Sequence, residues 1–535
     1  MTPDNHPTEQ RRDPHETSTE ISRLGAGELR RLMDEGSLSS AEVTTRLLER
    51  IEAVDQAGPA IRSVLRVADD AVEQAAARDR ERAGRTGGPA AALGPLHGIP
   101  VLVKDNIDTA GSLGTTAGSL ALDRDPPATD APIVRLLREA GAVILGKANL
   151  SEWAHFRGSP ASSGWSAAGG QTRNPFALDR NPGGSSSGSG AAVAARLAPL
   201  ALGTETDGSI NCPAAACGIV GLKPTVGLLS RTGIVPISSS QDTAGPMARS
   251  VTDVAVLLSV LAFGAADPED PATAGRPHGS ADYLGALQPG LEGIRLGVVR
   301  DAGYTGYHAA TDRLADGILG AFADAGAEVI DPVTGLPPIS EEDELTVLCH
   351  EFKAGVAAYL ARRAKGRGGD ISGLPTGLED VISFNEGCPE ELLQVFPQNY
   401  LQQSADAGGL DDAGYLAALE RNRQRTRADG SDALLARHRL DALVAPSMPP
   451  AWLIDQIVGD HAAGSSWSEA AVAGYPSITV PFGQLHGLPV GLTIWGPAWS
   501  EATLIRIAYA LEQQLGLSSA PEYLETVGDP ASRRP

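Results

Sequence analysis

The sequence predicts an α/β protein with a single large domain, in which helices cover both faces of a mixed, mostly parallel twisted sheet. Three observations support this prediction. Short apolar runs that end in Gly, Pro or polar residues recur between about residues 99 and 510, as buried strands do. Helical segments separate several of these runs, and such alternation is typical of sheets covered by helices. Hydrophobic residues make up 42% of the chain, which is enough for a large core.

The expected helices carry recognisable boundary signals. Residues 37–55 contain a capping box, because Ser39 and Glu42 stand three residues apart before apolar residues at helical spacing. The other expected helices include residues 69–83, 131–141 and 310–326. The expected strands are residues 98–108, 141–150, 196–203, 294–299, 327–331, 441–446 and 476–481.

No shift in composition marks a boundary inside the chain, so residues 21–520 are assigned to one domain. Residues 1–20 are polar and contain Pro, which predicts a disordered tail, and residues 521–535 are assigned to a C-terminal tail. The first twenty residues lack the apolar segment of a secretory signal, and no run is long enough to cross a membrane. These features predict a cytoplasmic protein without membrane attachment.

The charge balance restricts the possible partners. The chain has 43 basic and 66 acidic residues, a formal net charge of −23, so nucleic acid is not expected to bind. The spacing of Cys212, Cys217, Cys349 and Cys388 fits neither a disulfide framework nor a zinc site. Cys212 and Cys217 are interpreted as small buried hydrophobic residues. No metal and no cofactor are expected.

The stretch NPGGSSSGSG at residues 181–190 has the composition of a flexible linker. A linker leads away from the core, whereas this stretch runs directly into a helix former and an apolar, strand-like run. Residues 184–188 match the G-x-S-x-G nucleophile elbow with Ser186 at its centre, but that motif needs a preceding strand, which Pro182 and two glycines disfavour. No downstream His stands out as its partner. A phosphate loop needs a terminal Gly-Lys-Ser/Thr, which is absent.

The lysines are few and therefore informative. The chain has five lysines and 38 arginines, and Lys104, Lys147 and Lys223 stand in apolar surroundings. A site that needs a neutral amine must use Lys, because Arg keeps its proton in proteins. The alternative is a structural lysine at a strand end, whose aliphatic chain is buried and whose ammonium group reaches solvent. This alternative is favoured for Lys147 and Lys223. For Lys104 both interpretations remain open.

Besides the nucleophile elbow and the phosphate loop, a third interpretation is a catalytic site that uses two serines and a lysine. Ser209 follows Asp207 and Gly208 at the exit of an apolar run, where a glycine allows a tight turn that exposes backbone N–H groups. Ser209 lies 24 residues after Ser185, with one helix and one strand between them, and such a return can bring both ends together. Neutral Lys104 would then draw a proton through Ser185 while Ser209 attacks a carbonyl.

The blocks GGSSSGSGAAVAA and GTETDGSINCPAAACGIVGLKPT resemble the amidase signature family of Ser–Ser–Lys amidases, as do GIPVLVKDNIDT, ILGKANLSEWAHFRG and SSSQDTAGPMARSV. The resemblance covers roughly residues 20–515. It implies the amidase signature fold, with Ser209 as the acyl-forming nucleophile, Ser185 as a bridging serine after a cis peptide bond, and Lys104 as the base. It also implies an oxyanion hole formed by the backbone N–H groups around Thr206, Asp207, Gly208 and Ser209.

This chain departs from most of the family, which reads Asp-Thr-Gly-Gly-Ser-Ile-Arg where residues 205–211 read Glu-Thr-Asp-Gly-Ser-Ile-Asn. An aspartate in the oxyanion loop would oppose a developing negative charge unless its side chain points elsewhere. With several neighbouring blocks, these departures resemble the bacterial peptide amidases, which remove the amide from peptide C-termini. Asn211 is expected to suit the backbone of a peptide substrate.

The expected function is therefore hydrolysis of peptide C-terminal amides to the free acid and ammonia through an acyl-enzyme. The expected substrate is a small-molecule or short peptide amide, and no obligate protein partner is inferred. Two alternatives remain open, a general aliphatic or aryl carboxamide hydrolase and a catalytically silent binding protein with the amidase fold. The set Lys104, Ser185 and Ser209 argues against the silent protein.

Overall fold

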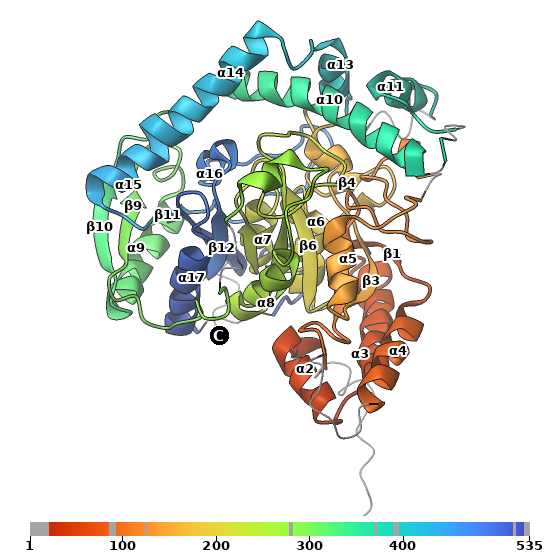
Figure 1. The fold of residues 1–535 in the computed structure, drawn as a ribbon. Coiled ribbons are helices and arrows are strands. Elements are labelled where there is room, and N and C mark those ends of the chain that lie inside the picture. Colours follow the sequence, from red (N-terminus) through yellow and green to blue (C-terminus); the bar gives the residue numbers. More distant parts are fainter. Residues whose placement is uncertain are drawn as a thin grey trace, which may run out of the picture.

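An eleven-stranded mixed sheet runs through the centre of the molecule (Figure 1). The computed structural model describes residues 21–84, 93–123, 126–277, 282–366, 368–369, 373–388, 395–516 and 520–528. The strand order is β1-β3-β2-β6-β8-β7-β12-β13-β11-β9-β10, and β4 and β5 form a separate pair. The strands are β1 (Val64–Val67), β2 (Pro100–Lys104), β3 (Val143–Ala148), β4 (Trp165–Ser166), β5 (Gly170–Gln171), β6 (Leu200–Glu205), β7 (Val220–Lys223), β8 (Thr243–Ala248), β9 (Arg295–Val299), β10 (Glu328–Val333), β11 (Ala442–Pro446), β12 (Ser477–Leu485) and β13 (Leu488–Trp495).

The sheet is mixed, as predicted, but the expectation that most pairings are parallel is wrong. Among the described strands of this sheet, four neighbouring pairs are parallel and six are antiparallel. One reason is the turn between β12 and β13, where His486 (φ 54°) and Gly487 (φ 82°) both have positive φ angles. Two such residues form a tight hairpin, which reverses the chain without a crossover helix.

Helices cover both faces of the sheet, as the alternating pattern predicts. The described α-helices are α2 (Ala26–Asp34), α3 (Ser40–Arg50), α4 (Ala71–Ala83), α5 (Pro132–Glu139), α6 (Ser187–Ala194), α7 (Asn211–Cys217), α8 (Val251–Leu261), α9 (Ala309–Asp324), α10 (Glu341–Gly366), α11 (Leu378–Glu386), α13 (Asn399–Asp406), α14 (Ala413–Arg423), α15 (Asp432–His438), α16 (Ser468–Ala473) and α17 (Glu501–Leu515).

The helices and strands named from the sequence are all present, with boundaries shifted by a few residues. The capping signal acts as expected, because Ser39 Oγ accepts a hydrogen bond of 3.0 Å from the backbone N–H of Glu42. The sequence prediction lacks β1, β7, β8 and β13 of the large sheet, and the separate pair β4 and β5. In β7 and β8, glycine and proline interrupt the apolar pattern that identifies a strand.

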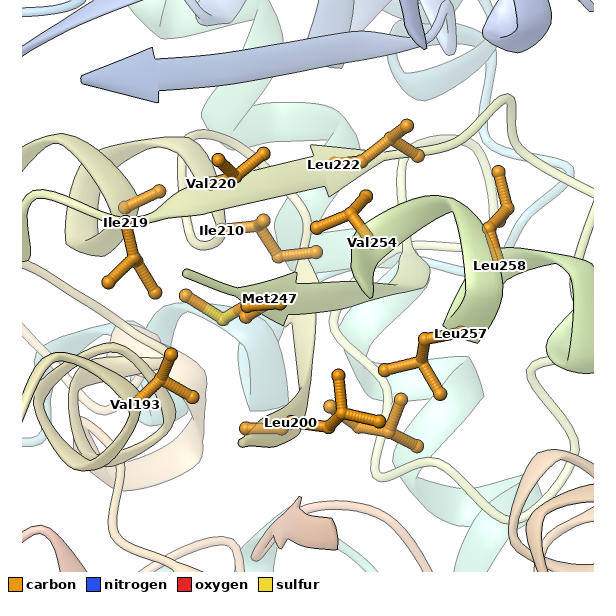
Figure 2. Packing of buried hydrophobic residues seen from close by; sticks show 14 of the residues in the cluster. Val193, Leu200, Ile210, Ile219, Val220, Leu222, Met247, Val254, Leu257 and Leu258 are labelled. Atoms are coloured by element: carbon orange, nitrogen blue, oxygen red, sulfur yellow. The ribbon is translucent and has the colours of Figure 1, made fainter. Parts of the chain in front are cut away.

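Helix α6 is buried along its whole length and contacts β2, β3, β6, β8 and α7. Figure 2 shows Val193 of α6 among buried side chains of the central strands and of α8. At Gly188, an added Cβ would lie 2.3 Å from the backbone oxygen of Ser63 and 2.4 Å from that of Asn149. The glycines and serines at residues 181–190 therefore permit close packing of backbone against backbone, and this stretch is not a linker.

A group of helices lies over one end of the sheet. Figure 1 shows α10 and α14 crossing the top of the molecule, with α11 and α13 beside them. Their apolar side chains form a second buried cluster, in which Phe352 of α10 packs edge-on against Trp153 and Phe156. This cluster places the first turns of α10 close to the ends of the central strands.

The expected terminal tails fall partly outside the described residues, which exclude residues 1–20 and 529–535. Within the described part, the backbone N–H of Tyr523 donates to Pro175 O at 3.0 Å, and Leu524 O accepts from Leu178 N at 2.7 Å. Residues 523–524 are thus attached to the domain. Among the described helices, none is both long enough and apolar enough to cross a membrane.

We predict that Gly188→Ala lowers the free energy of unfolding by about 1–3 kcal/mol, because the new methyl group must displace backbone atoms of Ser63 or Asn149. Chemical denaturation would measure the change. Gly27→Ala in α2 is the matched control, because nothing lies within 4 Å of its added Cβ, and it should be neutral or slightly stabilising. Equal stability of the two variants would contradict the close packing of α6.

Candidate active site

The predicted site residues gather where two neighbouring parallel strands end. Strand β2 ends at Lys104, and β6 ends at Glu205 beside it. Ser185 lies just before α6, and Ser209 lies between β6 and α7. The backbone N–H of Ser186 donates to Ser209 O at 3.1 Å, which holds the segment before α6 against the segment before α7. The structure therefore brings together the three segments that carry Lys104, Ser185 and Ser209.

Lys104 is fully buried, and its amine contacts only hydroxyl and carbonyl oxygens. Its Nζ lies 2.8 Å from Ser185 Oγ, 2.9 Å from Ser186 Oγ, and 2.8 and 3.2 Å from Thr204 Oγ1 and O. Among the described residues, no carboxylate lies within ion-pair distance of this nitrogen. Burial therefore lowers the pKa of Lys104 well below its ordinary value, and the negative charges of Glu205 and Asp242 offset this only partly.

The hydroxyl groups around Lys104 have different further partners. Ser186 Oγ donates to Thr204 O at 3.0 Å, and Thr204 Oγ1 also accepts from Asn106 Nδ2 at 3.0 Å. Ser185 Oγ has only Lys104 Nζ as a partner among the described residues. A neutral Lys104 amine can thus accept the hydrogen bond of the Ser185 hydroxyl.

The Gly184–Ser185 peptide bond is cis, as the family resemblance implies. The nucleophile-elbow alternative does not fit the structure, because no strand precedes Ser186 and its hydroxyl has no exposed surface. In the described part of the chain, no histidine forms a hydrogen bond with Ser185, Ser186 or Ser209.

Residues 206–209 form a loop with backbone donors available. Among the described residues, none accepts a hydrogen bond from the backbone N–H groups of Asp207, Gly208 or Ser209. Gly208 has φ +73°, and a Cβ there would lie 2.2 Å from Trp467 Nε1, so only glycine fits. Thr206 is held in place through other atoms: its Oγ1 donates to Asp242 at 2.5 Å, and its carbonyl accepts from Gln241 Nε2 at 3.3 Å.

Glu205 fixes the shape of this loop. Its carboxylate accepts from the backbone N–H groups of Ile210 (2.6 Å) and Asn211 (2.9 Å) at the start of α7. These are donors that a short helix leaves unpaired, so Glu205 closes the loop onto the helix.

The expectation that Asn211 faces the substrate is wrong. Asn211 is fully buried, and its Nδ2 donates to both carboxylate oxygens of Glu205 (2.9 and 3.0 Å) and to Ser477 Oγ (2.9 Å). Its Oδ1 accepts from Thr479 Oγ1 at 2.8 Å. Glu205 and Asn211 therefore form an internal pair behind the loop, where they stabilise its shape.

The side chain of Asp207 points away from the loop's own N–H groups. Its Oδ1 accepts from Ser468 Oγ of α16 at 2.9 Å, and its carboxyl group also contacts that of Glu344 on α10. This arrangement meets the condition under which an aspartate is compatible with an oxyanion loop.

The other buried lysines do not extend their amines to solvent, contrary to expectation. Lys147 is fully buried and contacts Ile107 O at 2.5 Å and Asp105 Oδ1 at 3.7 Å, and Lys223 is fully buried and contacts Pro224 O at 3.2 Å. Burial lowers the pKa of each to about 8. Cys212 and Cys217 are buried and free, as expected, and burial raises the pKa of Cys212 to about 12.

A cavity of about 470 Å³ adjoins the partners of Lys104. Asn106, Thr204 and Thr206 line it on one side and residues of α10 line it on the other, whereas Ser185 and Ser209 do not line it. The cavity therefore lies between α10 and the strand ends. Among the described residues, no group of three or more His, Cys, Asp or Glu side chains is arranged to hold a metal ion.

The amidase family model matches residues 42–505 of this chain. The chain belongs to the amidase family. It is 38% identical over 488 residues to a probable amidase of Arabidopsis thaliana, covering 89% of this chain and 87% of that protein. It is therefore an amidase, an enzyme that hydrolyses amide C–N bonds.

Solved amidase structures also resemble it along nearly the whole chain. Native peptide amidase from Stenotrophomonas maltophilia is 48% identical, with a TM-score of 0.86 and coverage of 94% of this chain and 99% of that one. A peptide amidase in complex with the competitive inhibitor chymostatin is 48% identical, with a TM-score of 0.87 and coverage of 94% and 100%.

Two residues of this site, Thr204 and Trp467, are missing from the sequence prediction. Thr204 contacts Lys104 directly, and Trp467 packs on Gly208. Ser186, considered above only as the centre of a nucleophile elbow, also contacts Lys104. Thr204 lies on β6, two residues before Thr206 at the end of that strand, so the period of two would have placed both side chains on the same face. No local signal identifies Trp467, because it lies more than 250 residues away along the chain.

We predict that Asn211→Ala acts on stability and leaves substrate choice unchanged. It removes the amide donors to the buried Glu205 carboxylate, which should cost about 1–3 kcal/mol in the free energy of unfolding. The ratio of kcat/KM for two amide substrates should stay within about 2-fold of wild type. Unchanged stability with an altered ratio would show that Asn211 contacts the substrate after all.

Proposed function

We propose that this amidase removes the amide group from peptide C-termini, and that Lys104, Ser185 and Ser209 perform the reaction through an acyl-enzyme. The observation that carries the mechanism is the buried Lys104 amine, 2.8 Å from Ser185 Oγ and without a carboxylate partner among the described residues. The proposal for the substrate is supported by 48% identity to peptide amidase over 94% of this chain.

In the proposed mechanism, neutral Lys104 accepts the proton of the Ser185 hydroxyl, and Ser185 Oγ accepts the proton of Ser209. Ser209 Oγ forms a bond to the carbonyl carbon of the amide, and the C=O π electrons move onto the carbonyl oxygen. The free N–H groups of Asp207, Gly208 and Ser209 are the donors proposed to stabilise this negative charge. Fixed donors of this kind cost no rearrangement when the charge develops.

The tetrahedral intermediate then breaks its C–N bond. Ser185 returns a proton to the departing nitrogen and regains one from Lys104, so that ammonia leaves and the acyl group remains on Ser209. In the second half of the reaction, water attacks the carbonyl carbon of the acyl-enzyme and gives its proton to Ser185 and Lys104 in the same way. The bond to Ser209 breaks, the free acid leaves, and the three side chains regain their starting protonation states. No step requires a metal ion or a redox cofactor.

A general carboxamide hydrolase is the second candidate function. The family model alone supports it, because amide hydrolysis does not require that the acyl group be a peptide. The greater identity to peptide amidase, 48% against 38% for the plant protein, favours the peptide substrate.

We predict that Lys104→Arg folds but loses at least about 100-fold in kcat/KM, because an arginine in this position cannot release its proton. The pKa of Lys104 is lowered and its neutral form is the active one, so wild-type activity should rise with pH on the acid side. Ammonia release measured across pH tests both statements. Lys365→Arg, on the exposed end of α10, is the control and should be unaffected. Near-normal activity of Lys104→Arg would place the base elsewhere.

The substrate proposal can be tested with an amidated tripeptide that has Gln at its middle position. Mass spectrometry should show a single gain of about 1 Da at the C-terminus, because OH replaces NH₂ there. The same tripeptide with a free C-terminal acid should remain unchanged, and Ser209→Ala serves as the enzyme blank.

Conversion at the Gln side chain, or fragments from backbone cleavage, would overturn the peptide-amide proposal and leave the general amidase activity. Release of ammonia from simple carboxamides without any reaction of the tripeptide would favour the second candidate function.

A further inference from the structure

Two acidic side chains meet beside the loop that carries the proposed oxyanion donors. Asp207 belongs to that loop, and Glu344 lies in the first turn of α10, which covers the strand ends. Their carboxyl groups lie within hydrogen-bond distance of each other, and both residues are partly buried. Nothing in the proposed reaction uses Glu344.

The remaining oxygens of this pair are held by neutral donors. Ser468 Oγ of α16 donates to Asp207 Oδ1 at 2.9 Å. Gln241 Nε2 donates to Glu344 Oε1 at 3.0 Å and to Thr206 O at 3.3 Å. The pair therefore connects α10 and α16 to the first two residues of the loop, and its geometry orients the Asp207 side chain away from the backbone donors.

Two carboxylates in contact repel each other unless one of them carries a proton. Among the described residues, neither Asp207 nor Glu344 forms an ion pair with a lysine or arginine. Burial, followed by the charge of Glu344, raises the pKa of Asp207 well above its ordinary value, and burial also raises the pKa of Glu344. The other titratable groups that face the pair are Glu205, Glu341, Lys223 and Tyr304.

We propose that Asp207 and Glu344 share one proton in the active enzyme, and that Glu344 is a positioning residue that keeps the Asp207 side chain away from the oxyanion donors. This inference rests on the proposed function, because it assumes that negative charge develops at residues 207–209. The shared proton holds the pair at a charge of −1. Loss of that proton would place a second negative charge beside the developing oxyanion.

The consequence is a fall in activity on the alkaline side of the pH profile. As pH rises, the pair loses its proton, the two carboxylates repel each other, and the transition state is stabilised less. Lys104 acts in the opposite direction, because its deprotonation raises activity on the acid side. The proposal thus predicts a bell-shaped profile in which the two limbs belong to different groups.

The test compares pH profiles of kcat for wild type and Glu344→Gln, measured on any amide that the wild type hydrolyses. Glu344→Gln keeps a hydrogen-bond donor beside Asp207 and prevents the charge of the pair from exceeding −1 at high pH. We expect Glu344→Gln to retain activity within about 3-fold at the wild-type optimum. One pH unit above the wild-type alkaline midpoint, wild type should have lost about 10-fold, whereas Glu344→Gln should retain its activity.

Glu342→Gln is the matched control, because Glu342 is exposed on the same turn of α10 and should leave the alkaline limb of the wild type in place. Infrared difference spectra of wild type minus Glu344→Gln at neutral pH supply a readout without turnover. They should contain the C=O band of a protonated carboxyl group.

An alkaline limb in Glu344→Gln equal to that of wild type would overturn the positioning role, even with normal stability. Absence of the protonated carboxyl band from the difference spectrum would overturn the shared proton. If the wild type hydrolyses no amide, the proposed function fails, and the infrared band by itself decides whether the pair holds a proton.

Discussion

The burial of one lysine amine among hydroxyl and carbonyl oxygens is the constraint on which the site depends. A charged Lys104 would lose its hydration without gaining a carboxylate, so burial stabilises the neutral form. Ser185, Ser186 and Thr204 supply its contacts, and all three are placed by the ends of β6 and the start of α6. A carboxylate next to this amine would keep it protonated and unable to accept a proton.

Close approach of backbone segments makes this arrangement possible. The segment before α6 and the loop after β6 must meet within hydrogen-bond distance, as Ser186 N and Ser209 O do. Positions 188 and 208 accept only glycine, because a Cβ would collide with neighbouring backbone at Gly188 and with the Trp467 ring at Gly208. The small residues at 181–190 therefore reflect dense packing, in which their conformational freedom is lost on folding.

The departures at positions 205, 207 and 211 are explained by two separate acidic pairings. Glu205 and Asn211 form a buried pair that shapes the loop from behind. Asp207 is held at the front by Ser468 and Glu344, which come from α16 and α10. Glu205 is matched to a nearby residue, whereas Asp207 is matched to residues from distant helices, and those distant partners do not follow from the local sequence.

The sequence by itself determined the α/β class and the positions of seven strands, and it singled out Lys104, Ser185 and Ser209 as the proposed catalytic residues, because apolar periodicity and long residue blocks are local properties. It also showed that residues 181–190 border a buried helix. Only the tertiary structure decided the antiparallel pairings, the burial of Lys147 and Lys223, and the direction of the Asn211 and Asp207 side chains. These depend on strand order and on contacts such as Asn211 with Ser477 and Thr479, more than 250 residues away, which no periodic pattern encodes.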